Sequence, residues 1–193
     1  MSRLLRLGIL LLVVSCGGGN NSAPRNLDDA CSVLDQRPRY LPALQQAERR
    51  WGVPVHVQMA TIYQESKFIG NAKTPHRFWL GIIPMGRQSS AYGYSQALDG
   101  TWDDYVKSTR SFGARRNKIE DATDFIGWYM DQSEQKLGIS KWDAGNQYLA
   151  YHEGHGGYSR GSQRQKAWLL RVAAEVAARA DRYQMQLISC GKT

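Results

Sequence analysis

The feature of this sequence that most constrains its fold is a long amphipathic segment near the C-terminus, Gln163 to Leu187. Its apolar side chains recur every three or four residues, which places them on one face of an α-helix. This stripe consists of Leu169, Val172, Ala173, Val176, Ala180 and Tyr183. A helix with one apolar face must bury that face against other elements, so the segment predicts a domain built by packing helices together.

Helical spacing also marks most of the remaining chain. The further predicted helices are Tyr40–Trp51, a segment after Pro54, a short helix near Trp102–Ser108 with Thr101 as N-cap, Glu120–Leu137 before Gly138, and Trp142–Tyr151 before Gly154. Residues 26–39 lack periodicity and predict a loop that leads into the domain. Residues 69–92 are irregular, and the apolar run Phe78–Gly86 within them predicts a short hairpin or a rigid loop. The sequence therefore predicts a single α-dominated domain of about six to eight helices, with short β or loop elements at one edge.

The N-terminus has the composition of an export signal. Two arginines precede the apolar run Leu7–Val14, which is too short to cross a bilayer as a mature helix. Residues 12–16, Leu-Val-Val-Ser-Cys, resemble the lipobox of bacterial lipoproteins, in which the cysteine is lipidated after cleavage. We therefore expect residues 1–15 to be a lipoprotein signal peptide and Cys16 to carry a lipid anchor. The alternative is an ordinary secretory signal or a buried cysteine.

Lipidation would also fix the compartment of the protein. Gly17, and not an aspartate, follows Cys16, which by the rule of the lipoprotein family favours the outer membrane, facing the periplasm. Residues 16–39 would then be the lipidated N-terminus and a flexible tether, because their first part is rich in Gly, Asn and Ser. Residues 40–193 would be the folded domain.

Cys31 and Cys190 are the other two cysteines of the chain. In an oxidising periplasm they could form a disulfide that ties the two ends of the domain together. The closed loop would be long, so the chain-entropy model allows about 4–5 kcal/mol of stabilisation. Two free thiols are the alternative.

The balance of charge favours an anionic partner. The chain has 25 Lys and Arg against 17 Asp and Glu, a formal net charge of +8, and removal of the two signal arginines leaves +6. Nucleic acid is not expected in a periplasm, whereas peptidoglycan stems and anionic lipid head groups are found there. Hydrophobic residues make up 42% of the chain, which is enough to bury a sizeable core. We expect the protein to be a monomer.

Glu65 is the strongest candidate for chemistry. Pro54 suits a first helical position and Gly70 a stop, so Glu65 should lie in the last turn or two of a half-buried helix. The negative end of the helix dipole and partial desolvation would both raise the pKa of its carboxyl. A carboxylic acid that stays protonated near neutral pH is what general-acid cleavage of a glycosidic bond requires. The alternative is a solvated glutamate with no function.

Two later stretches, Ala91–Leu98 and Ala150–Tyr158, support the chemical interpretation. With Glu65-Ser66 they resemble, in order, three motifs of lytic transglycosylases with the soluble-lytic-transglycosylase fold, relatives of goose-type lysozyme. The family motifs are Glu-Ser, Gly-Leu-Met-Gln and Ala-Tyr-Asn-Ala-Gly. The matching residues here are Glu65 and Ser66, Gly93 and Gln96, and Ala150, Tyr151 and Gly154. The resemblance covers about residues 45–160 and implies a lysozyme-like α+β fold.

The resemblance also implies a reaction on peptidoglycan glycan strands. Glu65 would protonate the oxygen between N-acetylmuramic acid and N-acetylglucosamine, and would then accept the proton of the C6 hydroxyl of the muramic acid. That hydroxyl closes onto C1 and yields a 1,6-anhydro sugar. The ring closure is intramolecular, which lets it compete with water. No metal or cofactor is implied.

Other positions take substrate-binding roles by the same resemblance. Ser66, Gln96 and Tyr151 would contact substrate or the acid; the alternatives are a helix-end polar residue, a turn residue and a core aromatic, respectively. Tyr92 and Tyr94 could offer faces on which sugars stack, although each alone is more often structural.

The chain also departs from the family pattern. His152 and Glu153 replace Asn and Ala: His152 could tune Glu65 or contact substrate, and Glu153 could be a second carboxylate that favours hydrolysis. Residues 69–92 look like an insertion that forms one wall of the groove, with Trp79 as its sugar platform.

Three alternatives to this function remain open. His152, Glu153 and His155 suggest a metal site, but the two histidines are three apart in a glycine-broken stretch, which does not fit a zinc peptidase helix. A muramidase, in which water replaces the C6 hydroxyl, shares the fold and the acid. A non-catalytic peptidoglycan-binding lipoprotein would keep the fold, but has no use for a desolvated acid.

Overall fold

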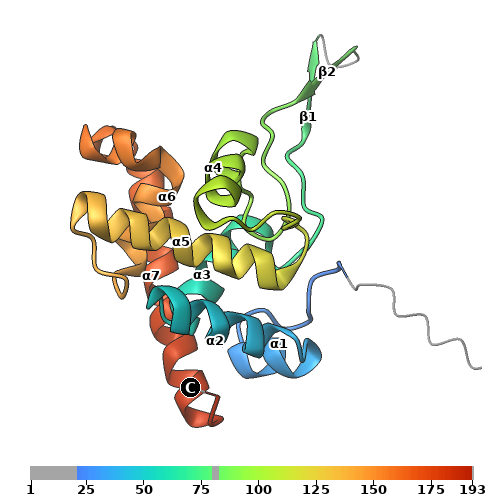
Figure 1. Ribbon diagram of the computed structural model, residues 1–193, viewed down its shortest axis with the longest axis vertical. Helices are drawn as coiled ribbons and strands as arrows, with labels where there is room; N and C mark the ends of the chain where they lie inside the picture. The colour runs from blue at the N-terminus through green and yellow to red at the C-terminus, as the bar shows by residue number, and fades with distance from the viewer. Residues whose placement is uncertain (1–20, 80–82, 193) are drawn as a thin grey trace, which may run out of the picture.

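Helix α3 (Val55–Ser66) lies at the centre of the computed structural model, which describes residues 21–79 and 83–192 (Figure 1). Nine of its twelve residues are buried, including the polar side chains of Gln58 and Thr61. The Gln58 amide donates to two backbone carbonyls, and the Thr61 hydroxyl donates to the carbonyl one turn earlier. The sequence predicted a half-buried helix; α3 is enclosed on most sides, and these internal hydrogen bonds satisfy the Gln58 N–H groups and the Thr61 hydroxyl.

Six further helices and one 3₁₀ turn surround α3 in the described part of the chain. They are α1 (Ala30–Gln36), α2 (Tyr40–Trp51), α4 (Asp99–Thr109), α5 (Ile119–Leu137), α6 (Ala144–Ser159), η1 (Ser162–Gln165) and α7 (Ala167–Ser189). Helix α2 packs along α5, and α7 packs on both α3 and α6 (Figure 1). The predicted helix-dominated, lysozyme-like fold is confirmed.

Aromatic and aliphatic side chains fill the space between these helices. The largest fully buried ones include Tyr105, Tyr183, Phe68, Phe125, Leu44 and Met59. Gly127 of α5 lets α2 approach closely, because a Cβ at this position would lie 2.5 Å from the Trp51 ring. The indole of Trp51 then donates to the Asp124 carboxylate over 2.8 Å, which fixes α2 on α5.

Several helix boundaries agree with the predictions. Helix α2 has the predicted limits, and α5 ends at Leu137, followed by Gly138 with a left-handed φ of 69°. Two boundaries are corrected. Helix α3 ends well before Gly70, because Lys67 already adopts a φ of 51°. Helix α4 begins at Asp99, before the expected cap Thr101, because the Ser90 hydroxyl accepts from the Asp99 N–H.

Helix α1 contradicts the prediction of a loop over residues 26–39. Asp29 caps the helix by accepting from the Ser32 N–H over 3.0 Å, and Val33 and Leu34 are buried in the main core. The helix has only seven residues, so its two turns show no recognisable apolar period in the sequence. The folded domain therefore begins before residue 40, where the sequence placed its start.

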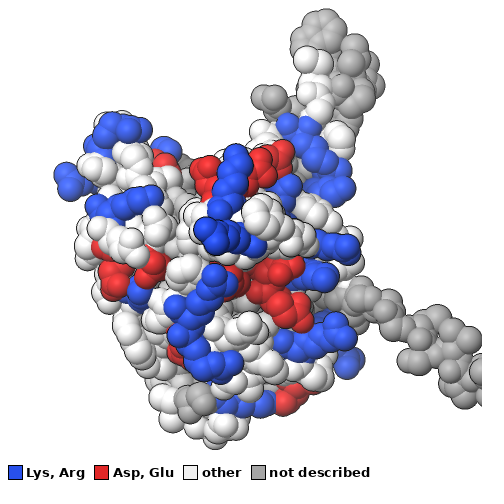
Figure 2. All heavy atoms as spheres, in the orientation of Figure 1, with Lys and Arg blue, Asp and Glu red and all other residues white. Residues whose placement is uncertain are grey.

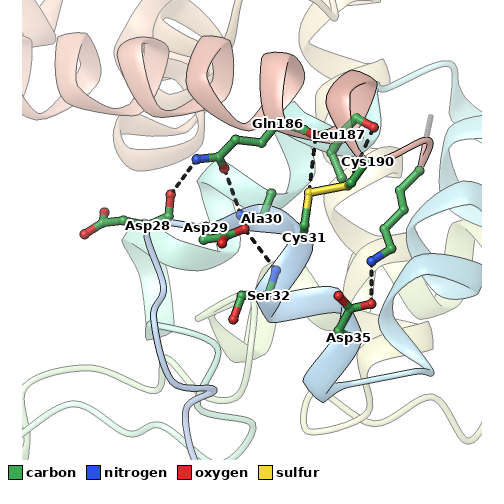
Figure 3. Close-up of a disulfide and its surroundings, with 10 residues drawn as sticks. Asp28, Asp29, Ala30, Cys31, Ser32, Asp35, Gln186, Leu187 and Cys190 are labelled. Carbon is green, nitrogen blue, oxygen red and sulfur yellow. Dashed lines mark hydrogen bonds and ion pairs between the residues drawn. A yellow bond between two sulfur atoms is a disulfide. The ribbon is translucent and has the colours of Figure 1, made fainter.

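A disulfide holds α1 against the end of α7. Cys31 and Cys190 are bonded, with their Cα atoms 6.5 Å apart (Figure 3). The Gln186 side chain of α7 adds two hydrogen bonds, one from the Ala30 N–H and one to the Asp28 carbonyl (Figure 3). The N- and C-terminal parts of the domain are therefore joined side by side.

The apolar run between α3 and α4 forms a hairpin, one of the two forms predicted for it. Strands β1 (His76–Trp79) and β2 (Ile83–Arg87) pair antiparallel, with His76 opposite Arg87 and an irregular register before Phe78. The hairpin projects away from the helices (Figure 1). Its two strands pack chiefly on each other.

No helix in residues 21–79 or 83–192 is both long enough and apolar enough to cross a membrane. The predicted signal peptide and Cys16, the predicted site of lipidation, lie outside the described residues.

Candidate active site

Glu65 lies at the C-terminal end of α3, where the chain turns sharply. The helix ends at Ser66, and Lys67 and Phe68 both have left-handed φ values, 51° and 60°. This conformation is unfavourable for residues with side chains. It is maintained because the Phe68 ring is fully buried and stacks on Tyr40, with 5.9 Å between the ring centroids. The turn stops the helix directly after the acid.

The Glu65 carboxyl has the electrostatic environment of a proton donor. Burial takes the group out of water and raises its pKa from 4.5 to about 7. A hydrogen bond with the Tyr148 side chain and the charge of Lys67 lower the pKa, but by less. The negative end of the α3 dipole also disfavours the ionised form. Glu65 keeps part of its surface accessible, so a substrate can reach a carboxyl that is partly protonated at neutral pH.

Tyr148 is a site residue that sequence reasoning missed. It lies on α6, is 5% exposed, and interacts through its hydroxyl with Glu65 and with the Gln64 side chain. Burial, and then the neighbouring Glu65 carboxyl, raise the pKa of Tyr148, so its hydroxyl stays neutral and can donate. Its signal was its position three residues before Tyr151, which puts both tyrosines on one face of a helix.

Tyr151 connects the third motif to the second. Its hydroxyl donates to the Ser95 carbonyl over 2.6 Å, and its ring packs edge-on against Tyr129 at 5.0 Å. It is close enough to Glu65 for that carboxyl to contribute to the raised pKa of Tyr151. Tyr151 therefore lies near Glu65, in line with the expectation that it would contact substrate or the acid. Its hydroxyl proton is used by Ser95, so in this structure Tyr151 holds the site together.

The second motif forms a tight turn beside α3. Gly93 has a φ of 80°, and a Cβ there would lie 2.0 Å from the Arg116 carbonyl oxygen, so only glycine fits. The Gln96 amide donates to the carbonyls of Ala72 and Gly93, over 3.0 and 2.8 Å. Gln96 therefore satisfies backbone carbonyl groups at the turn. This role is the alternative to sugar binding that the sequence left open.

Two residues predicted to contact substrate are buried within the protein. Tyr94 is 5% exposed, packs edge-on against Tyr40, and shares a 3.1 Å hydrogen bond with its hydroxyl. Ser66 is also 5% exposed, and its hydroxyl donates to the Ile62 carbonyl within α3. Tyr94 is thus a core residue and Ser66 a helix-end residue, which are the structural alternatives that the sequence left open.

Tyr92 lies between basic side chains at the edge of the same turn. Lys73 and Arg116 are 5.5 and 5.6 Å from its ring centre. Its backbone bridges Lys73 on one side and Ala97 on the other. Tyr92 remains partly exposed, which agrees with a sugar-facing role without testing it.

Glu153 is not a free carboxylate beside the acid. Its side chain is 4% exposed and is held by Lys166, at 2.7 and 3.0 Å from its two oxygens, and by the Ser162 hydroxyl. These partners lower the pKa of Glu153 to about 2, with Lys166 the larger cause. A carboxylate with so low a pKa is a weak base, which argues against the predicted role in hydrolysis.

The histidines of the third motif have separate partners. His152 Nδ1 is 3.0 Å from Glu153 Oε1, whereas His155 stacks on Tyr129 at 4.3 Å and shares a hydrogen bond with Ser133. Burial lowers the pKa of His155, so its ring is neutral at neutral pH. In the described residues, no three His, Cys, Asp or Glu side chains gather to hold a metal ion.

The remaining candidate positions are outside this constellation. Trp79 ends β1, but its side chain is not among those that the structure describes. Two cavities are found away from Glu65: one between α2, α4 and α5, and one between the start of α3 and the end of α7. Acidic side chains gather over α4 and the start of α5, with basic side chains around them (Figure 2). The first cavity is lined by three of these acids, Glu120, Asp121 and Asp124.

Comparison with known families finds a match over most of the chain. The pattern of a family described as a transglycosylase SLT domain matches residues 4–190. The match spans Glu65, the turn around Gly93 and the Tyr148–Tyr151 face of α6. No curated protein matches the chain.

Proposed function

The chain belongs to the transglycosylase SLT domain family, and on this premise we propose that it is a peptidoglycan lytic transglycosylase with Glu65 as its single general acid and base. The observation that carries the proposal is the carboxyl at the end of α3, whose pKa burial raises to about 7. An acid is most effective when its pKa is near the working pH, because it is then both protonated and able to release the proton.

The proposed reaction uses one carboxyl group twice. Protonated Glu65 gives its proton to the glycosidic oxygen of the bond between N-acetylmuramic acid and N-acetylglucosamine, and the C1–O bond breaks. The ionised carboxylate then takes the proton of the C6 hydroxyl as its oxygen bonds to C1. The products are a free N-acetylglucosamine end and a 1,6-anhydro-N-acetylmuramic acid end, and Glu65 is protonated again.

The surroundings of Glu65 support this single-acid scheme. Tyr148 donates a hydrogen bond to the carboxyl, which stabilises its ionised form after the first step. Glu153, the second carboxylate that hydrolysis would use, is paired with Lys166 and has a pKa of about 2. This pairing favours the transglycosylase over a muramidase.

Mass analysis of the sugars released from purified peptidoglycan tests the proposal. Wild type should release anhydro-muramyl ends, each one water lighter than a reducing end. Glu65→Gln should lose about 10²–10⁴-fold of this activity, the usual contribution of a general acid. Glu153→Gln is the matched control and should give the same type of product. Reducing ends from the wild type would mean a muramidase, and wall binding without any release would mean a binding lipoprotein.

We also infer an outer-membrane lipoprotein, because Leu12–Cys16 resembles a lipobox and Gly17 follows it. Labelling with a fatty acid in cells should mark the wild-type chain and not Cys16→Ala. Separation of the two membranes should then place the label in the outer one; label in the inner membrane, or none, would contradict this inference.

A further inference from the structure

Trp168 is an exposed aromatic residue with a polar ring beside it. It lies at the start of α7, and 49% of its surface is exposed. The His152 ring of α6 is 5.2 Å from the indole and nearly perpendicular to it, at 78°. The two rings therefore form a corner with an apolar side and a hydrogen-bonding side.

The polar side of this corner is fixed in orientation. Glu153 stays ionised because Lys166 and Ser162 hold it, so it can only accept from His152 Nδ1, 3.0 Å away. In the neutral ring, Nδ1 must then carry the proton, and Nε2 is an acceptor. Glu153, predicted as a catalytic carboxylate, is thus a positioning residue for His152.

The corner lies at the same end of the molecule as the acid. Helices α3 and α7 run antiparallel. At the start of α3, His56 lines one cavity together with Leu187, which is near the end of α7. Near the end of α3, the Tyr63 ring centre is 3.4 Å from the guanidinium carbon of Arg179, in the middle of α7. The start of α7 therefore extends beyond the Glu65 end of α3, on the side away from His56.

Tyr148 connects the two positions along α6. Its ring is 6.4 Å from His152, and its hydroxyl interacts with Glu65. The rings of Tyr148, His152 and Trp168 thus follow one another outward from the acid, from the buried Tyr148 to the half-exposed indole.

We propose that Trp168 and His152 form a glycan-binding subsite for the strand that Glu65 cleaves, a proposal that rests on the proposed function. A pyranose ring has an apolar face that stacks on an exposed indole. Hydroxyl and acetamido N–H groups at its rim can donate to the acceptor nitrogen of His152. The corner offers these two contacts to a sugar unit that lies beyond the one at the acid.

Binding to purified insoluble peptidoglycan tests the subsite, measured by sedimentation of the full-length Glu65→Gln chain so that the wall is not degraded. Adding Trp168→Ala should raise the half-saturation concentration at least threefold, and up to about tenfold, which is the size of an aromatic stacking contribution. Trp168→Phe should keep more than half of the lost binding, because an aromatic face remains.

Trp142→Ala in the same background is the matched control. Trp142 is also an exposed tryptophan, at 64%, and also has a histidine ring beside it, His56 at 5.5 Å. It lies at the opposite end of α3, where His56 is about 14 Å from Glu65 along the helix axis at 1.5 Å per residue. Its replacement should leave wall binding unchanged. Circular dichroism melting should show that all variants fold.

The possible outcomes separate the subsite from the catalytic proposal. A change of less than threefold in Trp168→Ala, or an equal loss in Trp142→Ala, overturns the subsite even if wild type releases anhydro sugars. If wild type releases nothing but binding still depends on Trp168, the catalytic proposal fails and the subsite stands. If no variant sediments with the wall, the subsite fails, and the catalytic proposal is decided by the release of anhydro sugars alone.

Discussion

At the residue scale, the Glu65 carboxyl makes folding less favourable as the pH rises. Its pKa is raised from 4.5 to about 7 in the folded chain, so between these values the unfolded chain ionises and the folded chain does not. Stability therefore falls through this window and stays low above it. The effect is on the order of 2 kcal/mol, after allowance for the partial exposure of the group.

Glu65→Gln should remove this penalty. We expect the variant to be more stable than wild type by on the order of 2 kcal/mol at pH 8. The two should be equally stable at pH 4, where Glu65 is largely protonated in both the folded and the unfolded chain. Urea unfolding at the two pH values measures the difference. A gain that is the same at both would mean that packing, and not ionisation, is responsible.

Tyr148→Phe should shift the pH profile of the reaction. The hydroxyl lowers the pKa of Glu65, so its removal should move the alkaline limb of the rate profile upward by about half a unit to one unit. Tyr158→Phe is the control on the same helix, since that hydroxyl donates to Asn146, and it should leave the limb in place. An unchanged limb in Tyr148→Phe would show that Tyr148 does not act on the acid.

Gly93→Ala should destabilise the fold strongly. The new Cβ would meet the Arg116 carbonyl at 2.0 Å, and φ is 80°, so we expect a loss of about 2–4 kcal/mol in chemical denaturation. Gly100→Ala is the control: nothing lies within 4 Å of its Cβ position, it lies in α4, and the change should be neutral or slightly stabilising. Equal losses at both positions would contradict this account.

The position of Glu65 near the end of a helix could be predicted from the sequence, but much of its surroundings could not. The pKa of its carboxyl is raised chiefly by burial, which depends on how the helices pack. Whether Tyr94 or Ser66 faces a substrate depends on how distant elements pack. In the folded chain Tyr94 is hydrogen-bonded to Tyr40, and the Ser66 hydroxyl is hydrogen-bonded within α3. The spacing of Tyr148 from Tyr151 places it on the same helix face, but its contact with Glu65 depends on the packing of α3 against α6.

At the element scale, helix prediction succeeded where an apolar period runs unbroken through the helix. Helices α2, α5 and α7 each contain three or more turns of apolar period, and their positions were predicted closely. Helix α1 has two turns and owes its stability to the Asp29 cap and to contacts with α7, which are tertiary. Helix α6 is interrupted at Gly154, with φ 71° and ψ 155°, which agrees with the predicted stop at these glycines; the further helical stretch that leads to Ser159 was not predicted.

Loss of the disulfide should destabilise the pairing of α1 with α7. The bond between Cys31 and Cys190 closes a separation of 159 residues, and we expect Cys31→Ser/Cys190→Ser to lose about 2–5 kcal/mol in urea unfolding. A reductant should lower the stability of wild type to the same level and leave the double variant unaffected. If the reductant also lowered the stability of the double variant, the reductant would be acting on something other than this disulfide.

At the scale of the whole molecule, the structure divides into a helical body and a projecting hairpin. The body contains the buried core, Glu65 and the proposed subsite, whereas strands β1 and β2 pack chiefly on each other (Figure 1). A two-stranded hairpin is marginally stable alone and contributes little to the body that carries it. The hairpin therefore owes little to the core, and the role of Trp79 as a sugar platform remains a prediction.

Replacing residues 76–87 with a short Gly-Asn linker should separate these contributions. Because the hairpin adds little to the core, Tm should change by only a few degrees, within about the shift that 1 kcal/mol gives in a domain of this size. Release of sugars from whole peptidoglycan should fall, and Trp79→Ala alone should reproduce most of that fall if the platform prediction is correct. Release from short soluble glycan fragments, which occupy only the region of Glu65, should fall less.

Two outcomes would contradict this account. A Tm drop of ten degrees or more would show that the hairpin is part of the fold. Full activity on the wall would show that the hairpin is not part of the substrate-binding surface.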